Sequence, residues 1–141
     1  MQVQPYLFFD GRCEEALQFY HKAIGAETTA LMRFKDSPEQ NEKCPSPPGA
    51  EDKVMHASFQ VGDTMVMASD GRCDEPMKFE GFSLSLAVNT EAEADKFFNA
   101  LTAGGKVIMP LTKTFWSPRF GMVTDKFGVM WMVSVLAEQK P

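Results

Sequence analysis

The chain has 141 residues, of which 44% are hydrophobic and 23% charged, a composition that predicts one globular domain with a substantial core. The formal net charge of -5 comes without any cluster of Lys and Arg, which argues against a nucleic-acid partner because phosphate backbones are bound by clustered basic side chains. No apolar run approaches the length of a membrane span or has the pattern of a signal peptide, and three cysteines without CxxC spacing fit a reducing cytoplasm better than a disulfide framework or a zinc ribbon.

The first predicted elements are a strand, a helix and a second strand. Residues 3–9 ("VQPYLFF") read as a strand, and Pro5 suits the start or the edge of a sheet because it lacks a backbone donor. Residues 13–27 ("CEEALQFYHKAIGAE") predict a helix, since apolar residues recur at spacings of three and four, and Gly25 is a plausible stop. Residues 28–35 ("TTALMRFK") predict the next strand.

A loop and a hairpin follow. Residues 36–52 have no apolar period and contain four prolines, which predicts a long surface loop of the kind that serves as a lid or a binding segment. Residues 54–70 ("VMHASFQVGDTMVMASD") predict a β-hairpin that turns at Gly62–Asp63.

The same order then repeats in the second half of the chain. Residues 82–89 predict a strand, and Thr90 with Glu93 forms the sequence signature of a capping box that opens a helix over 91–105. Residues 106–111 predict a strand, and residues 119–135 ("RFGMVTDKFGVMWMVSV") predict a hairpin that bends at 125–128.

The two halves align in sequence as well as in order. The helix segments "EALQFYHKAIGA" and "EADKFFNALTAG" match, as do the hairpin segments "GDTMVMAS" and "FGVMWMVS". The alternative is a chance coincidence within an ordinary α+β domain, but order and register agree together. The prediction is therefore a single α+β domain of tandem βαβββ modules, with module one at 1–69, a connector at 70–80 and module two at 81–141.

Four stretches carry a resemblance to a known family: "PYLFFDG", "EALQFY", "HASFQVGDTMVMASD" and "TFWSPRFGMVTDKFGVMWMV". The chain resembles the vicinal oxygen chelate superfamily, which includes the glyoxalase, bleomycin-resistance and extradiol dioxygenase proteins, and within it the PhnB-like branch. The resemblance covers nearly the whole chain. It implies a mixed sheet curved into a cup, with the ligand or metal inside.

Metal-using members of that superfamily carry His or Glu ligands on the first and last strands of each module. Carried over residue by residue, these positions fall on Pro5, Met67, Ser83 and Met132, none of which is a good ligand for a hard or borderline divalent ion. We therefore expect no metal and no cofactor. The branch is sometimes labelled as related to demethylubiquinone methyltransferases, but the sequence has no glycine-rich strand-to-helix turn for a nucleotide-type cofactor.

The candidate ligand-binding residues follow from the expected cup. His56 and Arg119 are predicted as counterparts that suit a small anionic or carbonyl-bearing ligand, unless both are solvated at the rim. Ser83 and Ser85 would leave room for the ligand, and Trp116 would shape the mouth or contact a second copy. An apolar floor, which could equally be plain core, is predicted from Met65, Met67, Met130 and Met132.

Three functions remain open at this stage. The first is binding of a small, partly apolar molecule without a metal. The second is a metal-dependent isomerase, lyase or dioxygenase whose ligands lie elsewhere, and the third is a non-catalytic dimeric protein with a filled cup. A homodimer is expected, because the edges of open sheets need cover. The cysteine usage places it in the cytoplasm.

Overall fold

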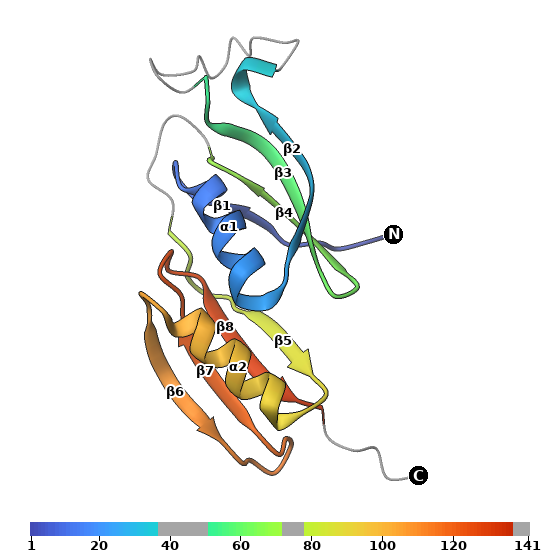
Figure 1. Ribbon diagram of the computed structural model, residues 1–141, viewed down its shortest axis with the longest axis vertical. Coiled ribbons are helices and arrows are strands. Elements are labelled where there is room, and N and C mark those ends of the chain that lie inside the picture. The colour runs from blue at the N-terminus through green and yellow to red at the C-terminus, as the bar shows by residue number, and fades with distance from the viewer. Residues whose placement is uncertain (37–50, 72–77, 137–141) are drawn as a thin grey trace. The chain divides into compact units, whose positions relative to one another are not determined.

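The computed structural model describes residues 1–36, 51–71 and 78–136 (Figure 1). The chain divides into two compact units, Met1–Met77 and Lys78–Pro141, and each contains one βαβββ module. Most of the loop predicted at 36–52 lies outside the described residues. In the part of the chain that the structure describes, no helix is long and apolar enough to cross a membrane.

Module one is a four-stranded mixed sheet with one helix. The strand order is β1-β4-β3-β2, with β1 parallel to β4 and the other pairs antiparallel. Its elements are β1 (Tyr6–Phe8), α1 (Cys13–Ile24), β2 (Glu27–Arg33), a short 3₁₀ helix (Phe34–Asp36), β3 (Val54–Val61) and β4 (Thr64–Ser69).

The helix α1 ends where the sequence predicts. Gly25 adopts a left-handed conformation with φ of 72°, and its N–H donates to the carbonyl of His21, so the glycine terminates the last turn. The apolar stripe of α1 packs on the sheet, where the Tyr20 ring lies 5.7 Å from Phe59 and 6.2 Å from Phe9. This contact covers one face of the sheet, and no helix of the described part of module one packs on the other face.

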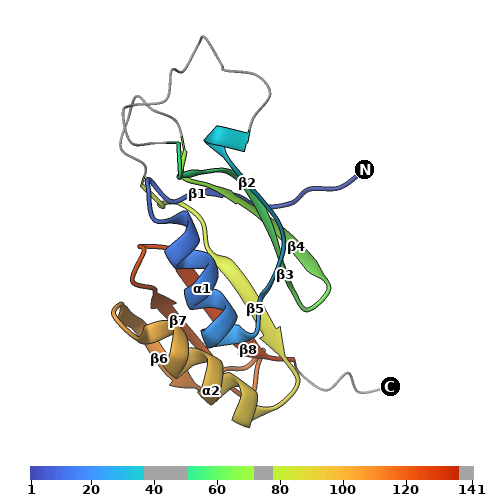
Figure 2. The same cartoon turned by 45° about the horizontal axis from the view of Figure 1, so that its top comes forward.

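Module two repeats this topology with the strand order β5-β8-β7-β6 (Figure 2). The N-cap predicted at Thr90 is confirmed, because the Glu93 N–H donates to the Thr90 hydroxyl at 3.1 Å. The Glu93 carboxylate in turn accepts a hydrogen bond from this hydroxyl, also at 3.1 Å. The elements are β5 (Leu84–Val88), α2 (Glu91–Thr102), β6 (Lys106–Thr112), β7 (Phe120–Thr124) and β8 (Met130–Val135).

Two close contacts fix the core of module two. A Cβ on Gly121 would lie 2.6 Å from the Phe98 ring, so β7 can pass beneath α2 only because this residue has no side chain. The Trp131 side chain is 3% exposed, and its Nε1 donates to Asp125 Oδ2 at 2.9 Å. Both modules therefore bury one face of their sheet under a helix, as the predicted α+β repeat requires.

Candidate functional site

Each sheet has a helix-covered face and a second face, which we call the open face. In β8 the burial alternates along the strand, with Trp131, Val133 and Val135 buried and the residues between them half-buried. In each sheet, the cross-strand pairings show which residues of the other strands lie on the helix-covered face and which lie on the open face. The open face of module one is built from Tyr6, Phe8, Met32, His56, Ser58, Gln60, Met65 and Met67.

A hydrogen-bonded aromatic group crosses the open face of module one. The Tyr6 hydroxyl lies 3.0 Å from His56 Nδ1, although Tyr6 is on the edge strand β1 and His56 is on β3. The Tyr6 ring also stacks on Phe8, with ring centres 4.9 Å apart. Burial raises the pKa of the Tyr6 phenol, so it stays protonated at neutral pH and retains its hydrogen for this contact or for a ligand.

A second polar contact on this face is made by Thr29 and Ser58. The two hydroxyls are 2.8 Å apart, and the Thr29 hydroxyl also lies 3.7 Å from the Met65 sulfur. Thr29 reaches this face because the register of β2 shifts between Thr28 and Ala30. The open face of module one therefore combines thioether sulfurs with a small number of fixed polar groups.

The open face of module two has a different composition. Ser85 lies opposite Met132, which in turn lies opposite Met122, and Met130 lies opposite Thr124. Ser83 is half-buried and precedes β5, so it belongs to the approach to this sheet. The Trp116 ring is 48% exposed and stands edge-on to Phe120, with ring centres 5.3 Å apart. Among the predicted residues, Ser85, Met130 and Met132 therefore share this face.

Arg119 does not point where the sequence analysis places it. Its Nε donates to Asp95 Oδ1 on α2 at 2.6 Å, so the guanidinium lies on the helix-covered side of module two. The expectation that Arg119 and His56 project from equivalent faces is therefore wrong. In the sequence, His56 and Arg119 become counterparts when the two hairpins are aligned with Val61 over Thr124.

The structural register gives a different match between the modules. Ala57 pairs with Ala68 in module one as Gly121 pairs with Val133 in module two, so the residue equivalent to His56 is Phe120. The sequence alignment was displaced by one residue because the hairpin turns differ in length. Val61 pairs with Thr64 around Gly62–Asp63, whereas Thr124 pairs with Met130 around a longer turn.

The same register shows which residues lie beside two of the positions implied for metal ligands. Tyr6 lies opposite Met67, and Ser85 lies opposite Met132, so Tyr6 and Ser85 share the open faces with these methionines. Pro5 instead contributes its carbonyl, which accepts the Met67 N–H. A phenol, a hydroxyl and two thioethers do not fit a hard or borderline divalent ion. Across residues 1–36, 51–71 and 78–136, no three His, Cys, Asp or Glu side chains come together as a metal site.

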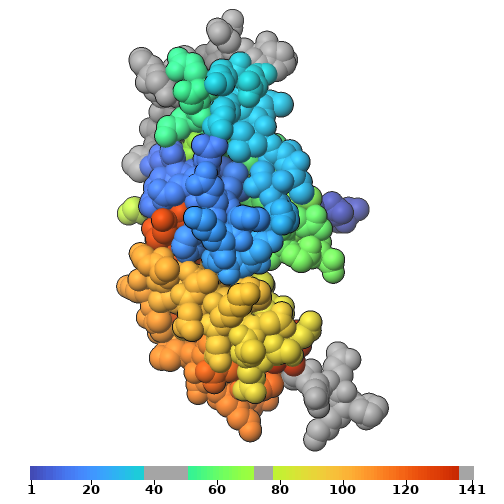
Figure 3. All heavy atoms as spheres, in the orientation of Figure 1, coloured from blue at the N-terminus to red at the C-terminus, as the bar shows by residue number. Residues whose placement is uncertain are grey.

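Two other features of module one lie away from the open face. A shallow groove of about 310 Å³ runs between α1 and β2, and it is lined by Leu17, His21 and Leu31 among others. These two elements are seen on the surface in Figure 3. Cys13 is fully buried at the start of α1, and burial together with the neighbouring Asp70 raises the pKa of its thiol to about 12.

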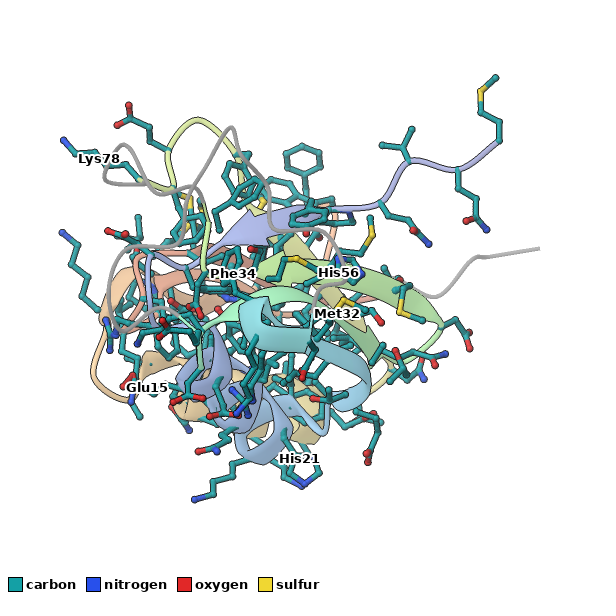
Figure 4. All side chains as sticks on the ribbon, turned by 90° about the horizontal axis from the view of Figure 1, so that it is seen from above. Glu15, His21, Met32, Phe34, His56 and Lys78 are labelled. Atoms are coloured by element: carbon teal, nitrogen blue, oxygen red, sulfur yellow. The ribbon has the colours of Figure 1, made fainter. Side chains whose placement is uncertain are left out.

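Sequence reasoning missed Tyr6, Phe8 and Met32 as members of the open face. The available signal was strand alternation, because neighbouring residues of a strand point to opposite faces. Leu7 is buried under the helix-covered face, so Tyr6 and Phe8 point to the open face. Figure 4 shows Met32 and His56 on the strands of module one, whereas Glu15 and His21 lie on α1.

Comparisons with known proteins show similarity over nearly the whole chain. The chain is 35% identical to the protein YjdN of Escherichia coli over 144 residues, which cover 99% of the chain and 98% of YjdN. The crystal structure of PA1353 from Pseudomonas aeruginosa is 46% identical, with a TM-score of 0.84 and coverage of 96% of this chain and 98% of that one. A PhnB protein from Bacillus cereus, described as a putative 3-demethylubiquinone-9 3-methyltransferase, is 29% identical, with a TM-score of 0.78 and coverage of 96% and 99%.

The fold of two βαβββ modules is that of the vicinal oxygen chelate superfamily. The fosfomycin resistance protein FosX of Mesorhizobium loti shares this fold alone, at 12% identity, a TM-score of 0.61 and coverage of 95% and 90%. Within the superfamily, residues 1–134 match the family described as 3-demethylubiquinone-9 3-methyltransferase. The chain belongs to this PhnB-like family.

Proposed function

We propose that this protein binds a small, partly apolar molecule on the open faces of its sheets, without the divalent metal used elsewhere in the superfamily. The observation that carries the proposal is the composition of the open face of module one. It offers the thioethers of Met65 and Met67 beside the hydrogen-bonded pair of Tyr6 and His56. Small-molecule sites are mostly apolar with a few placed polar groups, and this face has that character.

The polar groups define what the ligand must offer. The phenol of Tyr6 donates or accepts a hydrogen bond, and the imidazole of His56 does the same through its two nitrogens. A carbonyl or hydroxyl group on an otherwise apolar molecule satisfies both. The flexible thioethers adapt to its shape, because Met has three rotatable bonds and a polarisable sulfur.

The family name refers to a methyltransferase, but we do not extend that activity to this chain. The connection between β1 and α1 is Phe9–Arg12, which contains the single glycine Gly11 and not a glycine-rich loop for a nucleotide-type cofactor. The residues present do not favour Lewis-acid chemistry either, because the open faces place the phenol of Tyr6 beside Met67 and the hydroxyl of Ser85 beside Met132, and these are poor ligands for a divalent ion.

We also propose that the protein forms a homodimer. The strands β2 and β6 lie at sheet edges, and nearly all their residues are exposed, including Leu31, Met32, Val107 and Ile108. Exposed edges with apolar side chains favour association unless another chain covers them.

The test of ligand binding uses the two histidines of the chain as a matched pair. A panel of small aromatic and aliphatic carbonyl compounds is screened by thermal shift, because a ligand that binds only the folded state raises its stability by about 2.7 kcal/mol at 100 times its Kd. For each hit, His56→Phe introduces the residue found at the equivalent place in module two and should abolish the shift. His21→Phe, on the outer surface of α1, should leave the shift unchanged.

Two results contradict the proposal. The first is an equal effect of the two histidine variants on every hit, and the second is a panel without any hit. If the purified protein instead carries a stoichiometric divalent metal whose removal abolishes an activity, the metal-dependent enzyme becomes the better description.

A further inference from the structure

Three soft or borderline electron-pair donors lie on neighbouring strands of the open face of module one. Met32 on β2 and His56 on β3 are opposite residues of an antiparallel pair, as Figure 4 also shows. Met67 on β4 lies opposite Ser58, which is the next residue after His56 on the same face of β3. Opposite side chains have Cβ atoms about 5 Å apart and diagonal ones about 7 to 8 Å, distances that a methionine side chain spans.

The imidazole of His56 is already oriented for coordination. Its Nδ1 lies 3.0 Å from the Tyr6 hydroxyl, and no hydrogen bond from the described residues occupies Nε2. In the tautomer with the proton on Nδ1, the imidazole donates to the phenol oxygen and presents the Nε2 lone pair. A histidine that binds a metal commonly donates its other N–H to an oxygen acceptor in this way.

The donor set selects the kind of ion. Thioether sulfur is soft and binds monovalent copper, whereas divalent zinc, iron or manganese favour imidazole with carboxylate or thiolate. The register also places the carboxylate of Glu27 on this face. Glu27 pairs with Gln60, toward the end of β3 that is away from His56. Met67 is half-buried, which shelters a thioether from competition by water.

We propose that Met32 Sδ, Met67 Sδ and His56 Nε2 form a binding site for copper(I), with Tyr6 as the positioning residue. No electron transfer is involved, because the ion is bound in its monovalent state. The proposal is independent of the binding of a small molecule to the same face.

The internal repeat supplies a control within the same chain. The places of His56, Met67 and Met32 are taken in module two by Phe120, Met132 and Thr112, as the strand pairings show. Two of these three residues have no soft donor. Module two instead presents further thioethers, with Met122 opposite Met132 and Met109 opposite Met122, but no histidine, so it tests whether methionines alone bind the ion.

The experiment is an anaerobic titration of the full chain with copper(I) against a chromophoric chelator. It is done in a Cys44→Ser/Cys73→Ser background, because thiolates bind copper(I) and would mask the site, while Cys13 is fully buried. One ion should bind per chain. His56→Phe, Met32→Leu and Met67→Leu should each weaken binding by more than tenfold. Tyr6→Phe should weaken it by about tenfold, because it removes the hydrogen bond that orients the imidazole.

Met132→Leu is the matched control and should change the affinity by less than about twofold, since leucine keeps a similar volume. Thermal midpoints measured by circular dichroism identify any variant that fails to fold. As a second readout, silver(I) added to protein labelled at the methionine methyl groups should shift the NMR signals of Met32 and Met67 and leave that of Met132 in place. Absence of binding, equal weakening by Met132→Leu, or shifts confined to other methionines would overturn the proposal.

Discussion

Of the two tryptophans, Trp131 should cause the larger loss of folding stability when it is removed. Its indole is 3% exposed, and an aromatic side chain of this kind buries roughly 150 to 250 Å², so truncation to alanine should lower the free energy of unfolding by about 3 to 5 kcal/mol. Part of this free energy comes from the hydrogen bond that Trp131 Nε1 donates to Asp125 Oδ2 at 2.9 Å. The other oxygen of Asp125 accepts the N–H groups of Phe127 and Val129, so this carboxylate also organises the turn of the hairpin.

Two variants separate the contribution of the buried ring from that of the hydrogen bond. Trp131→Phe keeps most of the buried area and loses the hydrogen bond to a charged acceptor, which should cost about 1.5 to 3 kcal/mol. Trp116→Ala is the control, because its ring is 48% exposed and it should cost less than Trp131→Phe. The measurement is urea denaturation followed by far-ultraviolet circular dichroism, which does not depend on tryptophan fluorescence. If Trp131→Ala costs no more than Trp116→Ala, the assignment of Trp131 to the core of module two is wrong.

Four further predictions concern Gly121, Cys13 and the sheet edges. Gly121→Ala should destabilise the protein by about 1 to 3 kcal/mol, because the new Cβ would lie 2.6 Å from the Phe98 ring, and an undiminished denaturation midpoint would refute the close packing. Cys13 should resist iodoacetamide at pH 8.5 in the native protein and react after unfolding, as peptide mapping would show, since its thiol pKa is raised to about 12. The pKa of this thiol is higher in the folded than in the unfolded state. Its contribution to stability should therefore be complete below the unfolded pKa and be lost as pH rises toward 12. Cys13→Ala should not show this loss. Sedimentation at micromolar concentration should show a dimer, and a monomer would remove the proposal that edge strands β2 and β6 are covered by a second chain.

Local patterns in the sequence were sufficient to predict the elements of both modules. The N-cap at Thr90, the stop at Gly25 and the hairpin predicted over residues 119–135 each depend on residues that are close together in the chain. Interactions of this range are encoded in spacing, because a helix repeats every 3.6 residues and a strand every two. The repeat followed from the order of these elements.

The composition of the binding face depended on pairings between distant strands. Tyr6 reaches His56 across the sheet, and Arg119 turns to Asp95 on α2, although neither contact leaves a local pattern. The longer turn of the second hairpin displaced the alignment of the modules by one residue, and a displacement of one residue moves a side chain to the opposite face of a strand. The sequence by itself therefore determined which segments are strands and helices, whereas only the tertiary structure decided which side chains share the open face, because that depends on register between strands far apart in the chain.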